Sequence, residues 1–478
     1  RIYIQTLNAM GEEPSHIGST LIYSPSQMKR SLDFITKLTY NFVMKSQTPP
    51  DEHLQSIINL FTSGKLEQAL AVSNKMLERF PNSVILCNLS GASNAGLRQF
   101  DAAIDNYKQA INIKPDYADA HYNMGIAFKD KGDLEAAIDS YKNALNIKPD
   151  YAEAHNNMGN ALKDKGDLEA AIDSYELALK NKPDYAEATS NLLSFMTTYA
   201  SKKENPNAIV TANEEIRKIN IKNNTSKVIT DDQVVNFFSK SESHLSFNNL
   251  GIKTKLSQVY RHNSVDLNCS RHKSIFNQHD IIPEFCFGCY KVQVEPRSII
   301  ELIKLFIVFD QLELTENNTR KCMVELRPEI SGFYKGLIYC SGLKQAKKVS
   351  QYLDSIVKKS IGSGLSSKIK RGCSEYPTSY PNYKEINHSG AQLMNYREEW
   401  RVIEESHDRV NKIQSNEFIR ISLSGLNLSD VLIIRKWIDY ARGIGDPTAD
   451  LLNQKTIYYE DIYYRAKARL KLFHLTTT

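Results

Sequence analysis

Cysteine is scarce in this 478-residue sequence, and long apolar runs are missing. Seven cysteines are too few for a disulfide framework, and their odd number leaves at least one unpaired, as is typical of a reducing compartment. The longest apolar stretch, from Ile299 to Phe309, is interrupted by Glu301 and Lys304, whereas a membrane-spanning helix needs about 18 consecutive apolar residues. We therefore expect a cytoplasmic protein without a membrane span.

An excess of charge of one sign is also missing. The 60 Lys and Arg residues nearly balance the 55 Asp and Glu residues, and the formal net charge is +5. This charge is too small to indicate a nucleic-acid partner by itself. A hydrophobic content of 41% and a charged content of 24% are typical of a globular protein, and the length suits about two to four domains. Since the first residue is Arg1 and not Met, the sequence leaves open a start within a longer product.

A repeat with a constant step of about 34 residues is the strongest pattern in the chain. It is kept by Gly91, Gly125 and Gly159, by Ala69, Ala103, Ala137 and Ala171, by Tyr107, Tyr141 and Tyr175, and by Pro81, Pro115, Pro149 and Pro183. Within one period, apolar residues from Leu134 to Leu145 follow the spacing of one helix face, and Gly132 suits the tight turn before them. Each period therefore predicts a hairpin of two helices, which must stack on its neighbours to bury its apolar face.

This pattern resembles the tetratricopeptide repeat (TPR) family. The constant step, the small residues at the helix crossing and the closing proline are all present, and we place units at 50–83, 84–117, 118–151 and 152–185. A capping helix is expected at 186–200. The segment AEAHNNMGNALKDKGDLEAAIDSYELAL is similar to the repeats that precede the catalytic half of O-linked N-acetylglucosamine transferases. The resemblance implies a helical solenoid over residues 49–200.

In those transferases, a ladder of asparagines on the inner helices holds the backbone of an extended peptide. Asn123, Asn157 and Asn191 stand at the matching positions here, whereas Leu89 interrupts the ladder one unit earlier. The resemblance implies that a protein or extended peptide binds on the concave face. The residues expected to contact it are Asn123, Asn157, Asn191, Asn160, Lys129 and Lys163. The alternatives are that asparagine is simply frequent at this repeat position and that the charges of KDKGD belong to a solvated turn.

The resemblance to the transferases ends with the repeats. Their catalytic half needs two Rossmann-like domains that bind a nucleotide sugar. Only positions 201–478 follow the expected capping helix, and they contain no Gly-rich turn between a strand and a helix.

The second half of the chain predicts a different architecture. Residues 201–254 are polar, so we expect a linker with one or two short helices, and two halves that fold separately. Residues 255–390 predict an α+β domain. Its strands are expected at 289–296, 321–328, 334–340 and 366–373, and its helices at 297–312 and 343–361.

This β-α-β-β-α-β order is that of a ferredoxin-like domain, in which two helices cover one face of an antiparallel sheet. Residues 391–478 are expected to be largely helical. Residues 1–48 form a segment of uncertain structure, with a helix as one interpretation of 33–44.

Two pairs of potential metal ligands precede the first of these strands. Cys269 and His272 have the same spacing as Cys286 and Cys289, and thiolate and imidazole groups at such spacings are suited to zinc. His279 lies between the pairs and could replace one member. The sequence therefore suggests a structural zinc site. The alternative is that the cysteines are buried packing residues.

A further group occurs in the stretch KRGCSEYP. Cys373 follows a strand and is close in sequence to Arg371 and Glu375, so its thiol is a candidate nucleophile. No histidine is adjacent, and His272 or His388 would have to approach in space. Many sheets of the expected topology bind RNA through strand aromatics. The strand FYKGLIYC lacks two of the aromatics of that motif, which argues against a nucleic-acid partner.

The sequence therefore favours a non-enzymatic scaffold or adaptor, in which the repeats bind a protein or peptide and the α+β domain adds a second surface. The alternative is a transferase-like, thiol-dependent or metal-dependent enzyme whose repeats recruit a protein substrate. The two hypotheses differ in whether the polar side chains of the α+β domain converge in a pocket. The residues to examine are Cys373, Glu375, Arg371, Glu325 and Arg327. The sequence demands no cofactor, and zinc is the candidate.

Overall fold

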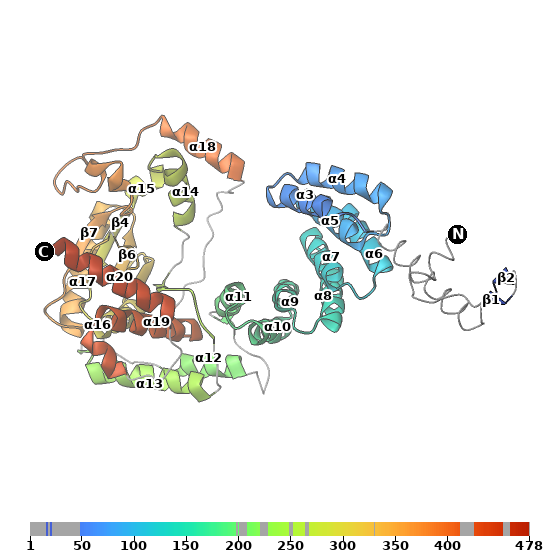
Figure 1. Ribbon diagram of the computed structural model, residues 1–478. Helices are drawn as coiled ribbons and strands as arrows, with labels where there is room; N and C mark the ends of the chain where they lie inside the picture. Colours follow the sequence, from blue (N-terminus) through green and yellow to red (C-terminus); the bar gives the residue numbers. More distant parts are fainter. Residues whose placement is uncertain are drawn as a thin grey trace. The chain divides into compact units, whose positions relative to one another are not determined.

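A computed structural model of the chain forms two compact units, Arg1–Lys182 and Pro183–Thr478 (Figure 1). The structure describes residues 16–17, 20–21, 48–196, 199, 208–219, 228–247, 252–262, 267–328, 330–411, 425–452 and 459–477. The helix considered at 33–44 lies outside these residues. Within the described residues, no helix combines the length and the apolar content that a membrane crossing needs.

The first unit is an array of paired helices, preceded by the short antiparallel strands β1 (His16–Ile17) and β2 (Thr20–Leu21). The pairs are α3 (Asp51–Thr62) with α4 (Leu66–Arg79), α5 (Val84–Gly96) with α6 (Phe100–Ile113), α7 (Ala118–Lys131) with α8 (Leu134–Ile147), and α9 (Ala152–Lys165) with α10 (Leu168–Asn181). These pairs occupy the four expected units. In Figure 1, α5, α7 and α9 line the inner side of the curve that the array follows, and α6, α8 and α10 lie on its outer side.

Local sequence explains the hairpins. Gly132 and Gly166 end α7 and α9 in the left-handed region, with φ of 96° and 91°, which glycine adopts without strain. Asp133 and Asp167 follow them and cap the next helices by accepting hydrogen bonds from backbone amides. The period therefore encodes both the end of one helix and the start of the next.

A contact between glycine and tyrosine fixes the spacing within each hairpin. A Cβ atom on Gly125 would lie 2.6 Å from Cε1 of the Tyr141 ring, and Gly159 has the same relation to Tyr175 at 2.7 Å. Both tyrosines are fully buried. Glycine therefore recurs because the ring of the second helix packs directly against the backbone of the first.

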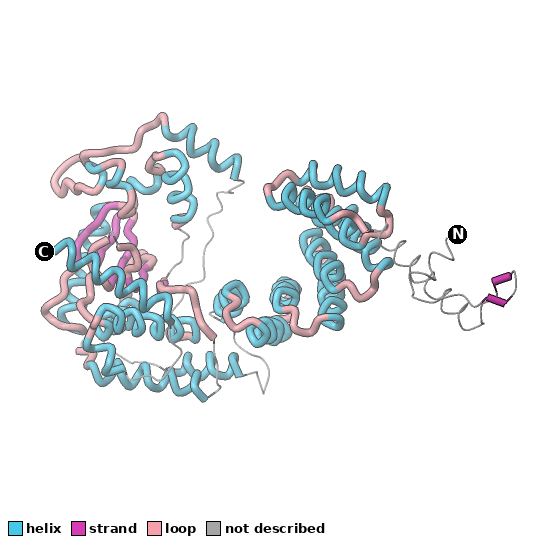
Figure 2. The backbone as a smooth tube through the Cα atoms, viewed as in Figure 1, coloured by secondary structure: helices cyan, strands magenta, loops and turns pink. Residues whose placement is uncertain are grey.

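The second unit contains a five-stranded antiparallel sheet (Figure 2). Its strand order is β3 (Gln258–Arg261), β5 (Arg320–Val324), β6 (Tyr334–Cys340), β4 (Tyr290–Val294) and β7 (Ser367–Arg371). Helices α16 (Ile299–Gln311) and α17 (Leu343–Ser360) pack on one face. Gly336 lets α16 approach closely, because a Cβ atom there would lie 2.4 Å from Leu305. Four strands and both helices lie where the sequence predicted them, whereas the edge strand β3 was not predicted.

The remaining described elements of this unit are mainly helical. They are α11 (Ala186–Met196), α12 (Ala208–Lys218), α13 (Asp231–Phe247), α14 (Cys269–His279), α15 (Glu284–Gly288), η1 (Tyr376–Thr378), η2 (Pro381–Tyr383), α18 (Trp400–Asn411), α19 (Leu428–Ile444), η3 (Pro447–Leu452) and α20 (Glu460–Thr477). The C-terminal helices agree with the expectation for 391–478. The expected capping helix, α11, belongs to the second unit, because the boundary between the units follows Lys182.

Helix α19 is buried along almost its whole length, including its charged residues. Arg261 of β3 donates hydrogen bonds to Asp430 of α19 and to Asp310 of α16. Arg435 pairs with Glu242 of α13, with Nε 2.5 Å from Oε1. Pairing of this kind offsets the cost of removing these charges from water.

These contacts change the interpretation of residues 201–254. We expected a linker with little to bury, but α12 and α13 both pack against α19. Asn213 of α12 accepts a hydrogen bond from the Leu428 amide at 3.0 Å, and Glu242 of α13 is buried. The two helices are therefore integral to the second unit. Their apolar faces have a partner that is distant in the sequence.

Replacing Gly125 with Ala is expected to lower the free energy of unfolding of the first unit by about 1–3 kcal/mol, because the new methyl group overlaps the Tyr141 ring. Urea unfolding followed by circular dichroism measures the change. In the double variant Gly125→Ala/Tyr141→Leu, the mutations should destabilise by less than the sum of their separate effects. If the destabilisation of the double variant equalled the sum of the two single effects, the Tyr141 ring would not be the reason for glycine at position 125.

Replacing Glu242 with Ala is expected to destabilise the second unit by about 3–5 kcal/mol, because Arg435 would remain buried without its carboxylate. Asp232→Ala, at an exposed position of the same helix, is the matched control and should change stability by less than about 0.5 kcal/mol. Equal effects of the two substitutions in thermal unfolding would show that α13 is not packed in the core.

Candidate functional site

Two of the predicted peptide-binding asparagines occupy equivalent positions on the inner helices. Asn123 of α7 donates to Oδ1 of Asn88 at 3.1 Å, and Asn157 of α9 donates to the Tyr122 hydroxyl at 3.0 Å. Each side chain is half-buried and is held by a residue of the preceding inner helix. A primary amide has a second N–H and a carbonyl for another partner. Asn191 lies on α11 of the second unit.

Asn160 has a structural contact that the sequence prediction missed. Its Oδ1 accepts a hydrogen bond from the buried Tyr175 hydroxyl at 2.7 Å. In the preceding repeat, Ile126 occupies this position, and the Tyr141 hydroxyl has no hydrogen-bond partner among the described residues. Asn160 therefore provides the hydrogen-bond acceptor for the buried tyrosine hydroxyl of its own hairpin.

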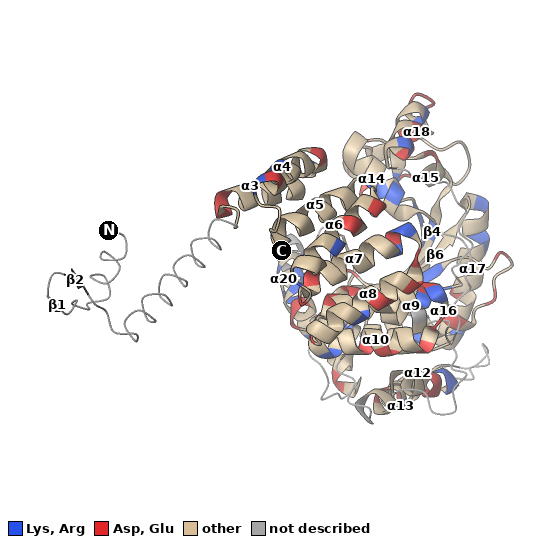
Figure 3. Ribbon diagram, turned by 90° about the vertical axis from the view of Figure 1, so that its right-hand side faces the viewer, with Lys and Arg blue, Asp and Glu red and all other residues tan. Residues whose placement is uncertain are grey.

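Lys129 and Lys163 lie in the last turns of α7 and α9. The Nζ atom of each is 3.8 Å from a carboxylate oxygen of Asp164. Long contacts between such charges contribute little to stability. Acidic and basic residues are interspersed along the helices of this unit (Figure 3), so charge of one sign does not mark a partner surface there.

Cys286 and Cys289, the first pair of predicted zinc ligands, have different surroundings. The Cys286 sulfur is buried 3.2 Å from the Tyr376 hydroxyl, whereas Cys289 packs against the cluster around Leu337 and Tyr339. Burial raises the pKa of both thiols, to about 11 for Cys289, and so disfavours the thiolate that a metal requires.

The second pair does not complete a metal site. The ring of His272 stacks on Phe285 with 5.1 Å between centroids, and Cys269 is exposed at the start of α14. His279 faces His407 instead, with 3.4 Å between ring nitrogens. Across the described residues, no three His, Cys, Asp or Glu side chains are grouped closely enough to hold a metal ion. The structure therefore does not assemble the zinc site that the spacing suggested.

A cavity of about 330 Å³ lies over the sheet face opposite α16 and α17. The strands alternate between the two faces, so every second residue of β4, β5 and β6 points into the cavity. The floor includes Lys291, Gln293, Lys321, Met323, Lys335, Leu337 and Tyr339, and the rim includes Lys273 and Phe276 of α14 and residues 372–376. The volume is that of a small-molecule site.

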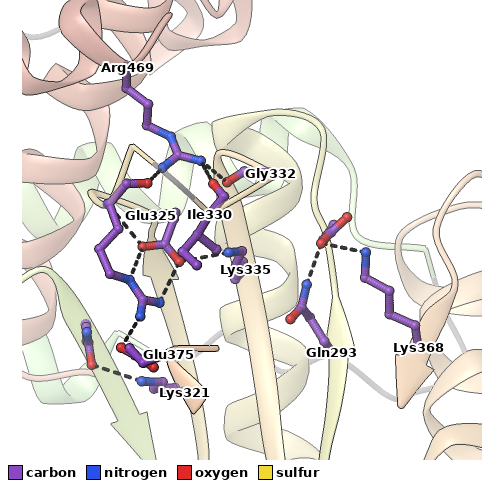
Figure 4. Close-up of polar contacts among 12 residues, drawn as sticks. Gln293, Lys321, Glu325, Ile330, Gly332, Lys335, Lys368, Glu375 and Arg469 are labelled. Carbon is purple, nitrogen blue, oxygen red and sulfur yellow. Dashed lines mark hydrogen bonds and ion pairs between the residues drawn. The ribbon is translucent and has the colours of Figure 1, made fainter. Parts of the chain in front are cut away.

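Paired charges occupy one end of this cavity (Figure 4). Glu325, just beyond β5, accepts hydrogen bonds from Lys335 Nζ at 2.8 Å and from Arg327 Nε at 2.9 Å. Burial alone would raise the pKa of the Glu325 carboxyl, but these hydrogen bonds lower it to about 2. Arg327 also donates to Glu375 at 2.6 Å. Arg469 of α20 donates to backbone carbonyls of the Arg327 loop and holds it in place.

Four of the five polar residues named as candidates therefore line one cavity. Cys373, Glu375, Glu325 and Arg327 are among its lining residues. Arg371 is not among them. It is buried on the other side of β7, where it donates to the Met394 carbonyl at 2.9 Å and lies over the Phe287 ring. Because side chains alternate along a strand, Lys370 and not Arg371 reaches the cavity.

Cys373 has a lysine neighbour and no histidine neighbour among the residues that line the cavity. Lys291 Nζ lies 3.6 Å from the Cys373 sulfur. His272 is buried against Phe285, so it is not a partner for this thiol. This arrangement lacks the base of a cysteine–histidine dyad.

The sequence reasoning missed the lysines of the cavity floor. The sequence does not single out Lys291, Lys321 or Lys370, and only the register brings them together. Lys291 is directly opposite Lys370 and Tyr339, and Lys321 is opposite Leu337. Lysine at alternate positions of neighbouring strands was the available signal. Because α14 and η1 contribute to the rim, this face is a cavity and not the open platform on which RNA bases stack.

Lys321 is expected to make stability depend on pH. Burial, with a smaller contribution from Lys291, lowers the pKa of its ammonium to about 8. The ordinary value is about 10.4, so between these values the unfolded chain holds a proton that the folded chain has lost. The free energy of unfolding contributed by this group therefore rises from about pH 8 to about pH 10, and the charged group is fully destabilising below pH 8.

Lys321→Met is expected to raise the free energy of unfolding at pH 7 by about 1–3 kcal/mol. It should also flatten the increase of the free energy of unfolding with pH above pH 8. Urea unfolding across this range tests both effects. Lys344→Met, at an exposed position of α17, is the control and should keep the pH dependence of the wild type. An unchanged slope in Lys321→Met would contradict the assignment.

Comparison with known proteins concerns the repeats. Models of the tetratricopeptide repeat match residues 98–132, 127–166 and 152–185. The chain is 39% identical over 100 residues to "Probable UDP-N-acetylglucosamine--peptide N-acetylglucosaminyltransferase SEC" of Arabidopsis thaliana. This match covers 21% of the chain and 10% of the relative, so the chain spans about a tenth of the length of the curated relative that it matches.

Solved structures are similar to part of the chain. MamA from Desulfovibrio magneticus RS-1 is 20% identical with a TM-score of 0.27, over 33% of this chain and 86% of that chain. The first TPR of Spaghetti (RPAP3) bound to the HSP90 peptide SRMEEVD is 24% identical with a TM-score of 0.24, over 25% of this chain and 94% of that chain. The period, the paired helices and the family matches together identify residues 98–185 as tetratricopeptide repeats.

Proposed function

We propose that this protein is a binding scaffold whose repeats hold an extended peptide by its backbone. The observation that carries the proposal is the equivalent placement of Asn123 and Asn157, one period apart on the inner helices α7 and α9 and each hydrogen-bonded to the inner helix before it. Each amide is oriented by a hydrogen bond to the preceding inner helix. An amide that is already oriented loses less rotamer freedom on binding, and it can donate to and accept from any peptide group.

The curated relative supports a peptide as the ligand. Its name describes an enzyme that acts on peptides, and the shared region consists of repeats. We do not propose transferase activity for this protein, because the residues after the repeats lie outside the region that is similar to the relative. We place the protein in the cytoplasm, in keeping with its scarcity of cysteine.

The second unit is proposed to be a ferredoxin-like domain with an added edge strand. The chain order β4-α16-β5-β6-α17-β7 and the sheet order β5-β6-β4-β7 support this assignment. Strand β3 extends the sheet beside β5.

An enzyme whose repeats recruit a protein substrate is the second candidate function. The convergence of Cys373, Glu325, Arg327 and Glu375 on one cavity favours it. Glu325, however, is held ionised by its two cationic partners, which removes it as a general acid near neutral pH. Lys291 is the group closest to supporting a reactive thiol. We therefore retain the scaffold as the principal proposal.

Backbone recognition predicts that a bound peptide tolerates side-chain changes better than changes of its amide groups. Peptides selected from a random display library on the full chain would be resynthesised with N-methyl groups at alternate backbone positions. N-methylation is expected to weaken binding by roughly tenfold or more, because each lost hydrogen bond contributes about 0.5–1.5 kcal/mol. Fluorescence anisotropy measures the affinity.

Asn123→Ala and Asn157→Ala should each weaken the same peptides several-fold, whereas Asn143→Ala, at an exposed position of the outer helix α8, should not. Circular dichroism shows whether each variant stays folded after it loses its hydrogen bond to Asn88 or Tyr122. Undiminished binding by a folded Asn123→Ala/Asn157→Ala variant would refute backbone recognition by these amides.

A further inference from the structure

The floor of the second-unit cavity carries positive charge that the described residues do not neutralise. Six Lys and Arg side chains line the cavity but only two carboxylates, Glu325 and Glu375. Both carboxylates are engaged at one end, by Arg327 and Lys335. Within the described part of the chain, Lys291, Lys321 and Lys370 have no carboxylate within ion-pair distance.

The register places two of these charges where they oppose folding. Lys291 of β4 is directly opposite Lys370 of β7, and like charges in such cross-strand pairs are destabilising. Lys368 of β7, two residues before Lys370, has the Glu295 carboxylate at 2.8 Å, and neither Lys368 nor Glu295 lines the cavity. The unneutralised lysines are confined to the cavity floor.

Hydrogen bonds to groups other than carboxylates orient the ammonium groups. Lys321 donates to Gln258 at 3.2 Å, and Lys291 donates to the Cys373 sulfur at 3.6 Å. The two Nζ atoms also lie 5.9 Å and 5.3 Å from the centre of the Tyr339 ring. The lowered pKa of Lys321 is consistent with a buried ammonium that lacks a counter-charge. Positions held in this way are preorganised for an incoming anion.

We propose that this cavity binds a small phosphate monoester, with its phosphate on Lys291, Lys321 and Lys370. Lysine ammonium groups act as point charges toward phosphate, and a dianionic group neutralises more of this site than a single carboxylate. Met323, Leu337 and Tyr339 form a buried apolar cluster beside the lysines. This cluster suits the organic part of an ester and distinguishes it from inorganic phosphate. The site belongs to the second unit and does not depend on the function proposed for the repeats.

Calorimetric titration of the full chain with phenyl phosphate, at about 0.15 M NaCl to screen nonspecific attraction, tests the proposal. Phenyl phosphate is expected to bind with a dissociation constant below about 1 mM and more tightly than inorganic phosphate, whereas phenol, which has the ring alone, should not bind. Failure of phenyl phosphate to bind would overturn the proposal. Equal affinities for phenyl phosphate and inorganic phosphate would overturn the assignment of an ester.

Lys291→Gln and Lys370→Gln are each expected to weaken phenyl phosphate binding by roughly tenfold or more, because each removes a charged hydrogen-bond donor. Lys368→Gln, on the same strand but paired with Glu295 outside the cavity, is the matched control and should retain the wild-type affinity. Without ligand, Lys370→Gln should melt at the wild-type temperature or above it, because a like-charge pair is removed. Equal losses in all three variants, or a Lys370→Gln variant that binds normally, would contradict the site.

Discussion

The second unit depends on burial of helix α19 together with its charges. Arg261 joins Asp430 of this helix to Asp310 of α16, and Arg435 joins it to Glu242 of α13. Each charge is tolerated inside the protein only because its partner is present. The same helix holds the floor of the cavity in place, since the Tyr440 hydroxyl donates to the Glu325 carbonyl at 2.6 Å. One face of the sheet is thus committed to the core, and the other is left for binding.

The two units present different chemistry to a ligand. In the repeats, local contacts recur with the period, and the conformation of Gly132 and the packing of Gly125 against Tyr141 are repeated at Gly166 and Gly159. Uncharged amides are the recurring polar groups on the inner helices, which suits a ligand recognised through its backbone. In the second unit, ammonium groups from β5, β4 and β7 line one cavity, which suits a compact anion.

The sequence predicted those features whose causes lie close together along the chain. The hairpins follow from contacts such as that of Gly125 with Tyr141, which belong to the same repeat, and β4 to β7 follow from alternation within each strand. Strand β3 has only four residues, too few for a clear pattern. Helices α12 and α13 looked like a linker because their partner, α19, lies near the other end of the second unit's sequence. The zinc site remains a prediction, and the described residues do not group its four side chains, because spacing fixes neither where α15 ends nor which way each sulfur points. The lysines of the cavity could not be grouped without the register that sets Lys291 opposite Lys370.

The cavity over one sheet face of the second unit is proposed to be a ligand site that does not depend on the repeats. Hydrogen–deuterium exchange of the full chain with and without phenyl phosphate measures this directly, because bound ligand slows local opening. The account predicts slower exchange in segments that contain β4, β5 and β7, with α5 to α9 unchanged. Slower exchange in the repeats, or no change in the three strands at saturating phenyl phosphate, would contradict it.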